Sequence, residues 1–490
     1  DARRSRALVF CVSVAHAQLM AHHFNAAGLP AACIVGDTDP EERRRAPRRL
    51  EQGELCALVT VDLYNEGVDL PFVDTLLLLR PTQSAVVFQQ QIGRGLRLSP
   101  NKESCLVLDF VGQHRADFRF DRLLGALTGQ SRRELIDSVE HGFGSLPAGC
   151  HVQLQRQTRD RVLASLRQAA NNRWPRLRAE LLAYAAQRPG GAPLQLSTFL
   201  RDQLLSLEDI YRQATGSSPS GWTTLRRDAG LLNSAAGPEE AYFSRRFGDL
   251  LHIEDTRRLD AMAALARPDS PEQADALTVQ MLAYQIDGQH HQTGTPEDWT
   301  ERLAAHPDIR QELGELTALL RARSTLSSQP LPGLEDTPLC LHAAYGIREI
   351  LTAVGWLSAS RRSPFQAGVL PLHDRRTELL FVTLDKSEGY HDRIAYRDHA
   401  ISTTQFHWQS QNSTGPDTAA GRRYLGTDTS AASSWQFQLF VRSRPGTPYR
   451  ACGPVHLVSA EGTRPMNIIW QLAQPLPVRL FREFSVLRDV

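Results

Sequence analysis

The stretch Gln90-Gln91-Ile92-Gly93-Arg94-Gly95-Leu96-Arg97 decides how the first part of this sequence is interpreted. Arg94 and Arg97 are three positions apart, so on a helical turn they lie on one face, and Gln90 lies one turn earlier on that face. Guanidinium groups fixed in this way bind phosphate oxygens and stabilise the negative charge of a phosphoryl-transfer transition state. Gly93 allows the backbone to approach a ligand closely. The stretch therefore predicts a phosphate-directed site.

Short apolar runs alternate with helical patterns on both sides of this stretch. We expect strands at residues 7–14, 31–35, 56–61, 75–79 and 105–110, and helices at 15–27 and 40–52. Fully apolar strands that alternate with helices are typical of a parallel sheet covered on both faces. Residues 1–125 are therefore predicted to form one α/β domain.

Three further features precede the arginine pair, in the order Gly36-Asp37-Thr38, Val59-Thr60-Val61-Asp62 and Glu66-Gly67-Val68-Asp69-Leu70-Pro71. This order and spacing resemble motifs four, five and six of superfamily-two helicases and translocases. The resemblance implies a second RecA-like domain at residues 1–125. Many members of that family have Thr where Val61 stands, so a hydroxyl contact to nucleic acid is not expected there.

The resemblance also assigns a role to individual residues. It implies that Arg97 is an arginine finger and that Arg94 and Gln90 assist it in catalysis. It places Gly67, Asp69 and Gly93 beside the nucleotide, and it places Asp62 and Gly36 on the nucleic-acid side of the domain.

A complete motor of this family also needs a glycine-rich phosphate loop ending in Lys-Ser/Thr, and an acidic motif that holds magnesium. The sequence contains no G-x-x-x-x-G-K-[ST], and neither Lys102 nor Lys386, its two lysines, has such a context. The resemblance implies ATP and Mg as cofactors, at a site completed by a first RecA-like domain absent from this chain. We expect that this chain, which begins at Asp1, is part of a longer protein and does not hydrolyse ATP alone.

Helical periodicity dominates residues 126–330, which we interpret as a helical connector ending at a Ser, Pro and Gly-rich linker over 324–336. Short helical patterns within 197–232 suit a small helix-turn-helix unit that would bring Arg226 or Arg227 to a nucleic-acid groove. Simple packing of these helices against one another is the favoured alternative.

Residues 335–490 are predicted to form a mainly β domain, with strands near 379–384, 435–441, 455–458 and 467–472. The segment Phe406-His407-Trp408-Gln409-Ser410-Gln411-Asn412 combines aromatic and amide side chains. Trp408 offers a face on which a base stacks, and Gln409, Gln411 and Asn412 offer donors and acceptors for a base edge. The alternative is that Phe406 and Trp408 are core residues of a strand.

The same region, with segments such as Pro465-Met466-Asn467-Ile468-Ile469-Trp470, resembles an uncharacterised C-terminal domain of bacterial helicases. Proteins with that domain often carry a phospholipase-D-like nuclease domain at the N-terminus, so such a domain is an implied partner. A nuclease site within residues 335–490 is a weaker interpretation, because Asp385 and Lys386 are adjacent and so face opposite sides of a strand.

Composition excludes several other classes of protein. The formal net charge of +1 excludes a global polycation, so nucleic-acid contacts must come from local basic patches. Seven cysteines without a C-x-x-C pair argue against disulfide scaffolds and zinc ribbons and suit a reducing cytoplasm. We expect no metal site within the chain, and no apolar run is long enough to span a membrane.

These observations together predict an α/β domain, the second RecA-like domain of a motor protein, followed by a helical connector and a mainly β (α+β) C-terminal domain. The predicted function is that of the C-terminal portion of an ATP-dependent helicase or translocase whose partner is nucleic acid, with DNA expected. Two alternatives stay open. One is a nucleic-acid-binding module without catalysis, and the other is a nuclease-associated protein of restriction or defence.

Overall fold

The computed structural model describes residues 2–61, 70–80, 85–100, 102–110, 120–143, 146, 149–170, 174–188, 194–211, 218–267, 274–287, 295–358, 368–384, 398–427 and 435–485. The chain divides into two compact units. The first consists of Asp1–Arg176 and Phe199–Ser206, and the second of Leu177–Thr198 and Leu207–Val490.

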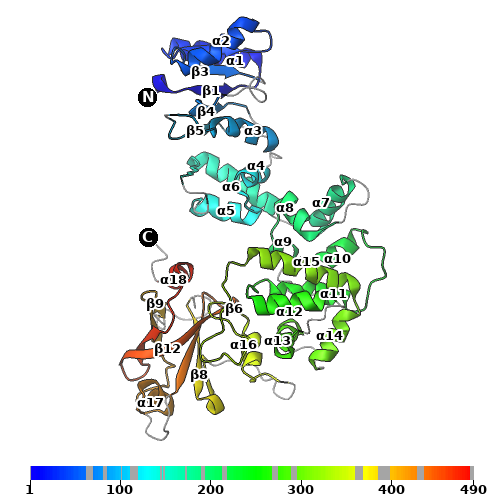
Figure 1. The fold of residues 1–490 in the computed structure, drawn as a ribbon, viewed down its shortest axis with the longest axis vertical. Coiled ribbons are helices and arrows are strands. Elements are labelled where there is room, and N and C mark those ends of the chain that lie inside the picture. The colour runs from blue at the N-terminus through cyan, green and yellow to red at the C-terminus, as the bar shows by residue number, and fades with distance from the viewer. Residues whose placement is uncertain are drawn as a thin grey trace. The chain divides into compact units, whose positions relative to one another are not determined.

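Five parallel strands form the sheet of the first unit, in the order β2-β3-β1-β4-β5. They are β1 (Ala7–Phe10), β2 (Ala31–Ile34), β3 (Ala57–Thr60), β4 (Thr75–Leu78) and β5 (Leu106–Asp109). Figure 1 labels β3, β1, β4 and β5 of this sheet. Successive side chains of a strand point to opposite faces, so Leu8 and Phe10 pack into one hydrophobic cluster while Ala7 and Val9 pack into another. The predicted RecA-like parallel sheet, with a core on each face, is confirmed.

Helices cover this sheet and extend the first unit beyond it. They are α1 (Val14–Ala26), α2 (Pro40–Glu51), α3 (Ala85–Gly95), α4 (Phe120–Thr128), α5 (Arg132–His141) and α6 (Arg156–Ala170). The start of α2 follows from its sequence, because the Asp39 carboxylate accepts the amide hydrogens of Glu41 and Glu42 and Pro40 fits the first helical position. A buried ion pair between Arg132 and Asp121, at 3.0 Å, joins α5 to α4.

The boundary between the units falls within α7 (Trp174–Ala186) and α8 (Leu196–Gln203), so the expected connector over 126–330 is divided between them. In the part of the chain that the structure describes, the main part of the second unit opens with the helices α9 (Leu207–Ile210), α10 (Trp222–Asp228), α11 (Glu240–Arg246), α12 (Thr256–Ala266), α13 (Ala276–Asp287), α14 (Pro296–Ala304) and α15 (Pro307–Arg323). The buried Glu312 of α15 accepts the backbone N–H groups of Trp222 and Thr223, at 2.8 and 2.9 Å, and so caps α10.

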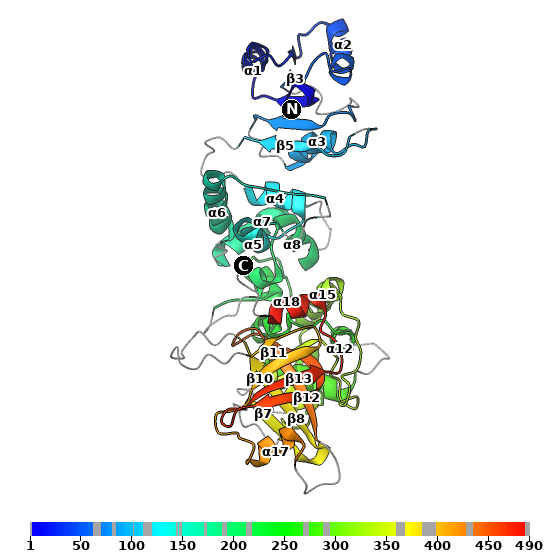
Figure 2. The same ribbon diagram turned by 90° about the vertical axis from the view of Figure 1, so that its left-hand side faces the viewer.

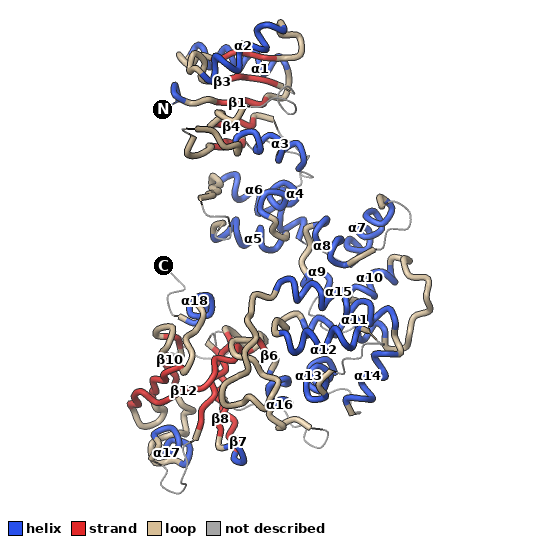
Figure 3. Tube along the Cα trace, viewed as in Figure 1, coloured by secondary structure: helices blue, strands red, loops and turns tan. Residues whose placement is uncertain are grey.

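A mixed sheet, mainly antiparallel, follows these helices (Figure 3). Its order is β7-β8-β11-β12-β13-β10-β9, with β6 paired to β12 and with β8 and β11 parallel. The strands are β6 (Ala344–Tyr345), β7 (Val369–Leu372), β8 (Thr377–Thr383), β9 (His399–Ala400), β10 (Gln405–Gln409), β11 (Gln436–Arg442), β12 (Tyr449–Glu461) and β13 (Asn467–Leu472). The helix α16 (Ile347–Ala353) lies between β6 and β7, while α17 (Ala419–Leu425) and α18 (Val478–Phe484) lie at opposite ends of the sheet (Figure 2).

The segment 324–336 differs from the linker that its composition predicts. Leu331 and Leu334 are completely buried in the hydrophobic cluster beneath β7, β8 and β12, and the Leu331 amide donates to the Leu339 carbonyl at 2.9 Å. The Pro332 carbonyl also accepts a hydrogen bond from the Gln438 side chain of β11. The segment is therefore an integral part of the second unit, which joins helices and sheet in one compact body.

Candidate functional site

The arginine-bearing stretch forms the end of α3, but its two arginines have different environments. α3 ends at Gly95, so Arg94 lies in the last helical turn and is only 8% exposed. Arg97 lies two residues beyond the helix and is exposed. The prediction that both arginines share one helical turn is therefore not met, since the chain leaves the helix between them.

Lys102 fixes the backbone around Arg97. Its ammonium group donates to the carbonyl oxygens of Gly95 at 2.6 Å, Arg97 at 2.9 Å and Pro71 at 3.1 Å. The Gly95 carbonyl is at the C-terminal end of α3, where a positive charge is favourable. Burial lowers the pKa of this ammonium group. One lysine therefore ties the end of α3 to Pro71, the last residue of the Glu66–Pro71 motif.

The two glycines of the stretch serve different purposes. A Cβ atom at Gly95 would lie 2.3 Å from the sulfur of Cys105 and 2.9 Å from the Leu76 side chain, so Gly95 lets α3 pack closely against the sheet. A Cβ atom at Gly93 would meet no described atom within 4 Å. The packing of the described residues therefore does not require a glycine at position 93.

Of the other residues expected near nucleotide or nucleic acid, the structure describes Gly36 but not the remaining three. Asp62, Gly67 and Asp69 lie outside the described residues. Gly36 is exposed, in the turn between β2 and α2, and its carbonyl accepts a hydrogen bond from the Arg43 guanidinium. The same guanidinium nitrogen also donates to the carbonyls of Val35 and Thr38 at 3.3 Å, so Arg43 holds the shape of this turn.

Trp408 is a core residue, which corrects the expectation that it offers a stacking face for a base. Its side chain is 4% exposed and packs against Tyr424 and Trp470, with ring centroids 5.3 and 6.1 Å away. Phe406 is completely buried on the same face of β10. The alternating pattern of this segment therefore reflects a strand with one buried face.

The amide residues of the same segment do reach the surface. Gln409 ends β10, and its side-chain amide donates to the side-chain oxygen Oδ1 of Asn467 on the neighbouring strand β13 at 3.3 Å. Gln411 and Asn412 are exposed in the loop that follows. These three amides stay candidates for nucleic-acid contact, without an aromatic platform from Trp408.

The structure also corrects the helix-turn-helix assignment for Arg226 and Arg227. Arg226 is 4% exposed, and its guanidinium lies 5.6 Å from the ring centre of Trp222. Arg227 forms ion pairs with Glu240 at 2.6 Å and Asp308 at 3.3 Å. Both arginines hold α10 within the helical bundle, which agrees with the simple packing alternative.

A nuclease site in the C-terminal sheet gains no support from the described residues. The Glu378 carboxylate, which is completely buried, accepts hydrogen bonds from the Tyr424 hydroxyl at 2.8 Å and from Arg423 at 2.9 Å. Asp385 and Lys386 lie outside the described residues. Within the described part of the chain, no three His, Cys, Asp or Glu side chains are grouped to hold a metal ion.

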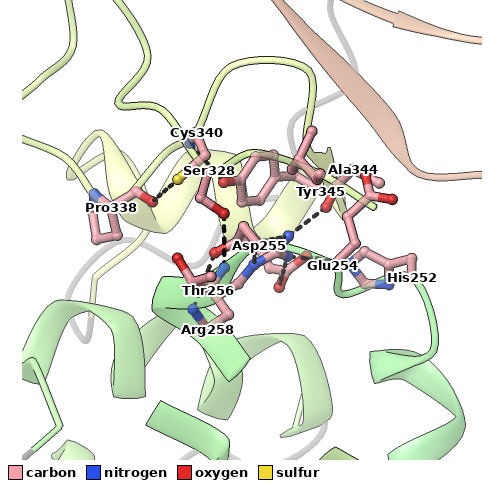
Figure 4. Close-up of polar contacts among 12 residues, drawn as sticks. His252, Glu254, Asp255, Thr256, Arg258, Ser328, Pro338, Cys340, Ala344 and Tyr345 are labelled. Atoms are coloured by element: carbon pink, nitrogen blue, oxygen red, sulfur yellow. Dashed lines mark hydrogen bonds and ion pairs between the residues drawn. The ribbon is translucent and has the colours of Figure 1, made fainter. Parts of the chain in front are cut away.

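A buried ionic cluster in the second unit was not predicted from the sequence (Figure 4). Arg258 of α12 is fully buried and pairs with Asp255 at 2.6 Å and with Glu349 of α16 at 2.7 Å. It also donates to the Ala344 carbonyl at 2.6 Å and lies 3.9 Å from the ring centre of Tyr345. No local signal identifies this cluster, because Arg258 and Glu349 are 91 positions apart.

The pKa of Glu349 in this cluster depends on burial and on His252 as well as on Arg258. The His252 ring lies 2.6 Å from the second oxygen of Glu349. Burial raises the pKa of Glu349, but the charges of Arg258 and His252 outweigh it and lower the pKa to about 2. The carboxylate is therefore ionised at neutral pH, and the cluster joins the helices of the second unit to its sheet.

The first unit contains a RecA-like parallel sheet, and its first 99 residues carry a helicase C-terminal domain. Residues 1–99 match the family described as helicase conserved C-terminal domain, and residues 339–484 match the domain of unknown function DUF3427. In the described residues, no helix combines the length and apolar character that a bilayer crossing requires.

Individual relatives are similar to this chain over short regions. The chain is 37% identical over 105 residues to the "Putative ATP-dependent helicase IRC3" of Saccharomyces cerevisiae, covering 21% of this chain and 15% of that protein. It is 34% identical over 120 residues to the type I restriction enzyme EcoKI endonuclease subunit of Escherichia coli K12, covering 22% of this chain and 10% of that protein. The solved C-terminal domain of the DEAD-box protein Dbp5 aligns with a TM-score of 0.22 and 15% identity, over 33% of this chain and 81% of that structure.

Proposed function

We propose that this chain is the C-terminal portion of an ATP-dependent helicase or translocase that acts on DNA. In this proposal the first unit supplies one wall of an ATP and Mg site, and a first RecA-like domain in the same polypeptide supplies the phosphate loop. The observation that carries the proposal is the exposed Arg97 on a backbone held by Lys102, within a helicase C-terminal domain.

The surroundings of Arg97 support a role at an interface between domains. Leu96 and Leu98, its neighbours in the chain, are 66% and 96% exposed. Two large apolar side chains exposed close together beside a charged residue agree with a surface that another domain covers. Arg97 would then extend into the covered cleft and stabilise the charge on the transferred phosphoryl group.

The residues present fit one part of an ATP site. Arg97 and Arg94 would face phosphate oxygens, Gln90 would assist them from the preceding turn, and Gly93 leaves room for a ligand close to the helix. Gly67 and Asp69 are proposed to lie beside the nucleotide, and Asp62 and Gly36 beside nucleic acid. ATP supplies the phosphoryl group that is transferred, and Mg neutralises its charge.

The isolated chain provides the first test of this proposal. Because a phosphate loop is missing from the sequence, we expect the 490-residue chain to show no hydrolysis of ATP, with or without DNA. Turnover by this chain that Arg97→Ala abolishes would refute the proposal that a first RecA-like domain must supply the phosphate loop. Turnover that is insensitive to Arg97→Ala would instead indicate a contaminating ATPase.

A role in restriction is a second candidate, favoured by the likeness to the type I restriction subunit. The motor would then move DNA for a nuclease domain carried elsewhere in the polypeptide. A cytoplasmic location agrees with both candidates, because all seven cysteines are free thiols. ATP-dependent cleavage of plasmid DNA by the longer protein would support this candidate, and DNA movement without cleavage would exclude it.

A further inference from the structure

A polar groove of about 680 Å³ lies within the second unit, between the helical bundle and one end of the sheet. Four arginines from separate parts of the fold line it: Arg323 at the end of α15, Arg444 in the β11–β12 turn, Arg450 on β12 and Arg479 on α18. None of these residues belongs to the motor site described above. The groove is therefore a separate feature of the C-terminal part of the chain.

The groove carries an excess of positive charge. Among its described lining residues, four arginines face two carboxylates: Glu254 forms an ion pair with Arg450, and Glu483 accepts a hydrogen bond from Ser443. Among the described residues, the carboxylate paired with Arg323 is the distant Glu208, at 3.8 Å. Among the described residues, no carboxylate lies within ion-pair distance of Arg444 or Arg479, and both side chains belong to exposed residues.

The backbone around these arginines is held in place. The Thr447 hydroxyl donates to the Arg444 carbonyl at 2.7 Å and accepts from the Arg444 amide at 3.4 Å, which closes the turn that carries Arg444. Arg450 also donates to the His342 carbonyl at 3.3 Å. On the helical side, His252 and Glu254 line the groove directly beside the buried Arg258 cluster (Figure 4).

The residues that line the groove favour some anionic ligands over others. No Phe, Tyr or Trp is among its described lining residues, so it offers no platform for stacking a base or an adenine ring. Arginines spread over α15, the β11–β12 turn and α18 suit a row of phosphates, each contacted by a separate guanidinium. We propose that this groove binds the phosphodiester backbone of a nucleic-acid strand, independently of its sequence.

The salt dependence of binding tests this proposal. Anisotropy of a labelled mixed-sequence 20-mer would be measured with the 490-residue chain between 50 and 200 mM salt. Each phosphate contact to a single strand contributes about 0.7 to the slope of log K against log salt, so the double variant Arg444→Ala, Arg479→Ala is expected to lower the slope by about 1.4 and to weaken binding about tenfold. Arg444→Lys with Arg479→Lys should keep the wild-type slope, because the charges remain.

Arg482→Ala is the matched control, since Arg482 is an exposed arginine of the same helix α18 that does not line the groove. It should leave both affinity and slope unchanged. The proposal is overturned if the double variant binds like the wild type, or if Arg482→Ala lowers the slope equally. Displacement of the strand by inorganic phosphate at constant ionic strength would also overturn it, since the site would then take a free anion.

A stability measurement and the absence of ATP from the assay distinguish this proposal from misfolding of the variants and from the proposal for Arg97. The thermal unfolding midpoint of each variant should equal that of the wild type, and the single variants Arg444→Gln and Arg479→Gln replace any double variant that misfolds, each expected to lower the slope by about 0.7. The assay contains no ATP. A failure of the groove to bind DNA therefore leaves the proposal for Arg97 standing, and a failure of the Arg97 proposal leaves the groove standing.

Discussion

Lys102 is the residue whose contacts bear most directly on Arg97. Lys102→Met keeps the apolar stem but removes the three hydrogen bonds to the carbonyls of Gly95, Arg97 and Pro71. We expect a loss of about 1–3 kcal/mol in the free energy of unfolding, because the donor is charged. Urea unfolding of this chain measures that loss, and the ATPase rate of the longer protein measures the accompanying displacement of Arg97.

Lys102→Arg is the informative companion variant. The guanidinium is larger than the ammonium group and holds its donors in a fixed planar fork, so it does not occupy the same point between the three carbonyls, and the charge alone should restore stability only in part. If Lys102→Met unfolds at the same urea concentration as the wild type and keeps the full ATPase rate, Lys102 does not position Arg97.

Gly93 and Gly95 make a second comparison at the level of single residues. Gly95→Ala forces a Cβ atom against Cys105 and Leu76 and should destabilise the first unit by about 1–3 kcal/mol. Gly93→Ala meets no described atom and should leave stability unchanged or raise it by about 0.5–1 kcal/mol, because alanine favours helices.

The two glycine variants should also differ in activity. If Gly93 leaves room for nucleotide, Gly93→Ala should raise the KM for ATP in the longer protein while its unfolding midpoint is retained. Full activity of a stable Gly93→Ala protein would show that no ligand approaches the helix at this position.

At the level of elements, the cluster around Arg258 joins α12 to α16 and β6. The Glu349 carboxylate has a pKa of about 2 in the folded chain against an ordinary value of 4.5. A lowered pKa contributes stability above the unfolded value, and that contribution disappears as pH falls through the folded value. Glu349→Gln should therefore be much less stable than the wild type at pH 7, by about 3–5 kcal/mol, because Arg258 loses a buried partner.

The pH dependence of that difference is the decisive measurement for the cluster. The gap between the free energies of unfolding of wild type and Glu349→Gln should be largest at pH 7 and should narrow between about pH 5 and pH 2. Asp417→Asn, at an exposed carboxylate, is the control and should show a small gap. A Glu349→Gln gap that is constant over this range would contradict the assignment of an ionised Glu349.

The strands and connecting segments also show which parts of the fold can be predicted from the sequence and which cannot. The apolar runs at 7–14, 56–61 and 75–79 predict β1, β3 and β4 to within a few residues, because strands buried on both faces have a distinctive composition. The segment 324–336 has the composition of a linker, yet Leu331 and Leu334 occupy the core. Composition does not reveal that β11 supplies a hydrogen bond to such a segment.

The candidate site was predictable only in part, for a related reason. The order of motifs points to Arg97 as a candidate, since the resemblance depends on residues close together in the sequence, and its role stays a proposal. The burial of Trp408 depends instead on Tyr424 and Trp470, which come from α17 and β13. The contacts of Lys102 and Arg258 likewise reach across the fold, to Pro71 and Glu349, and local patterns carry no information about them.

At the level of the whole molecule, the chain combines a helicase C-terminal domain with a DUF3427 domain joined firmly to a helical bundle. The matched regions span 15% of the yeast relative and 10% of the restriction subunit, so the activity of a complete protein is a proposal. In that proposal Arg97 acts on ATP, while the groove around Arg444 and Arg479 holds nucleic acid.

The central claim is that Arg97 is an arginine finger, and the DNA-stimulated ATPase rate of the longer protein tests it most directly. Arg97→Ala should lower kcat by about 10³–10⁵-fold while the unfolding midpoint is retained. Arg122→Ala removes an exposed arginine of α4 in the same unit and should leave kcat unchanged. An Arg97→Ala protein that hydrolyses ATP at the rate of the Arg122→Ala control would contradict the claim.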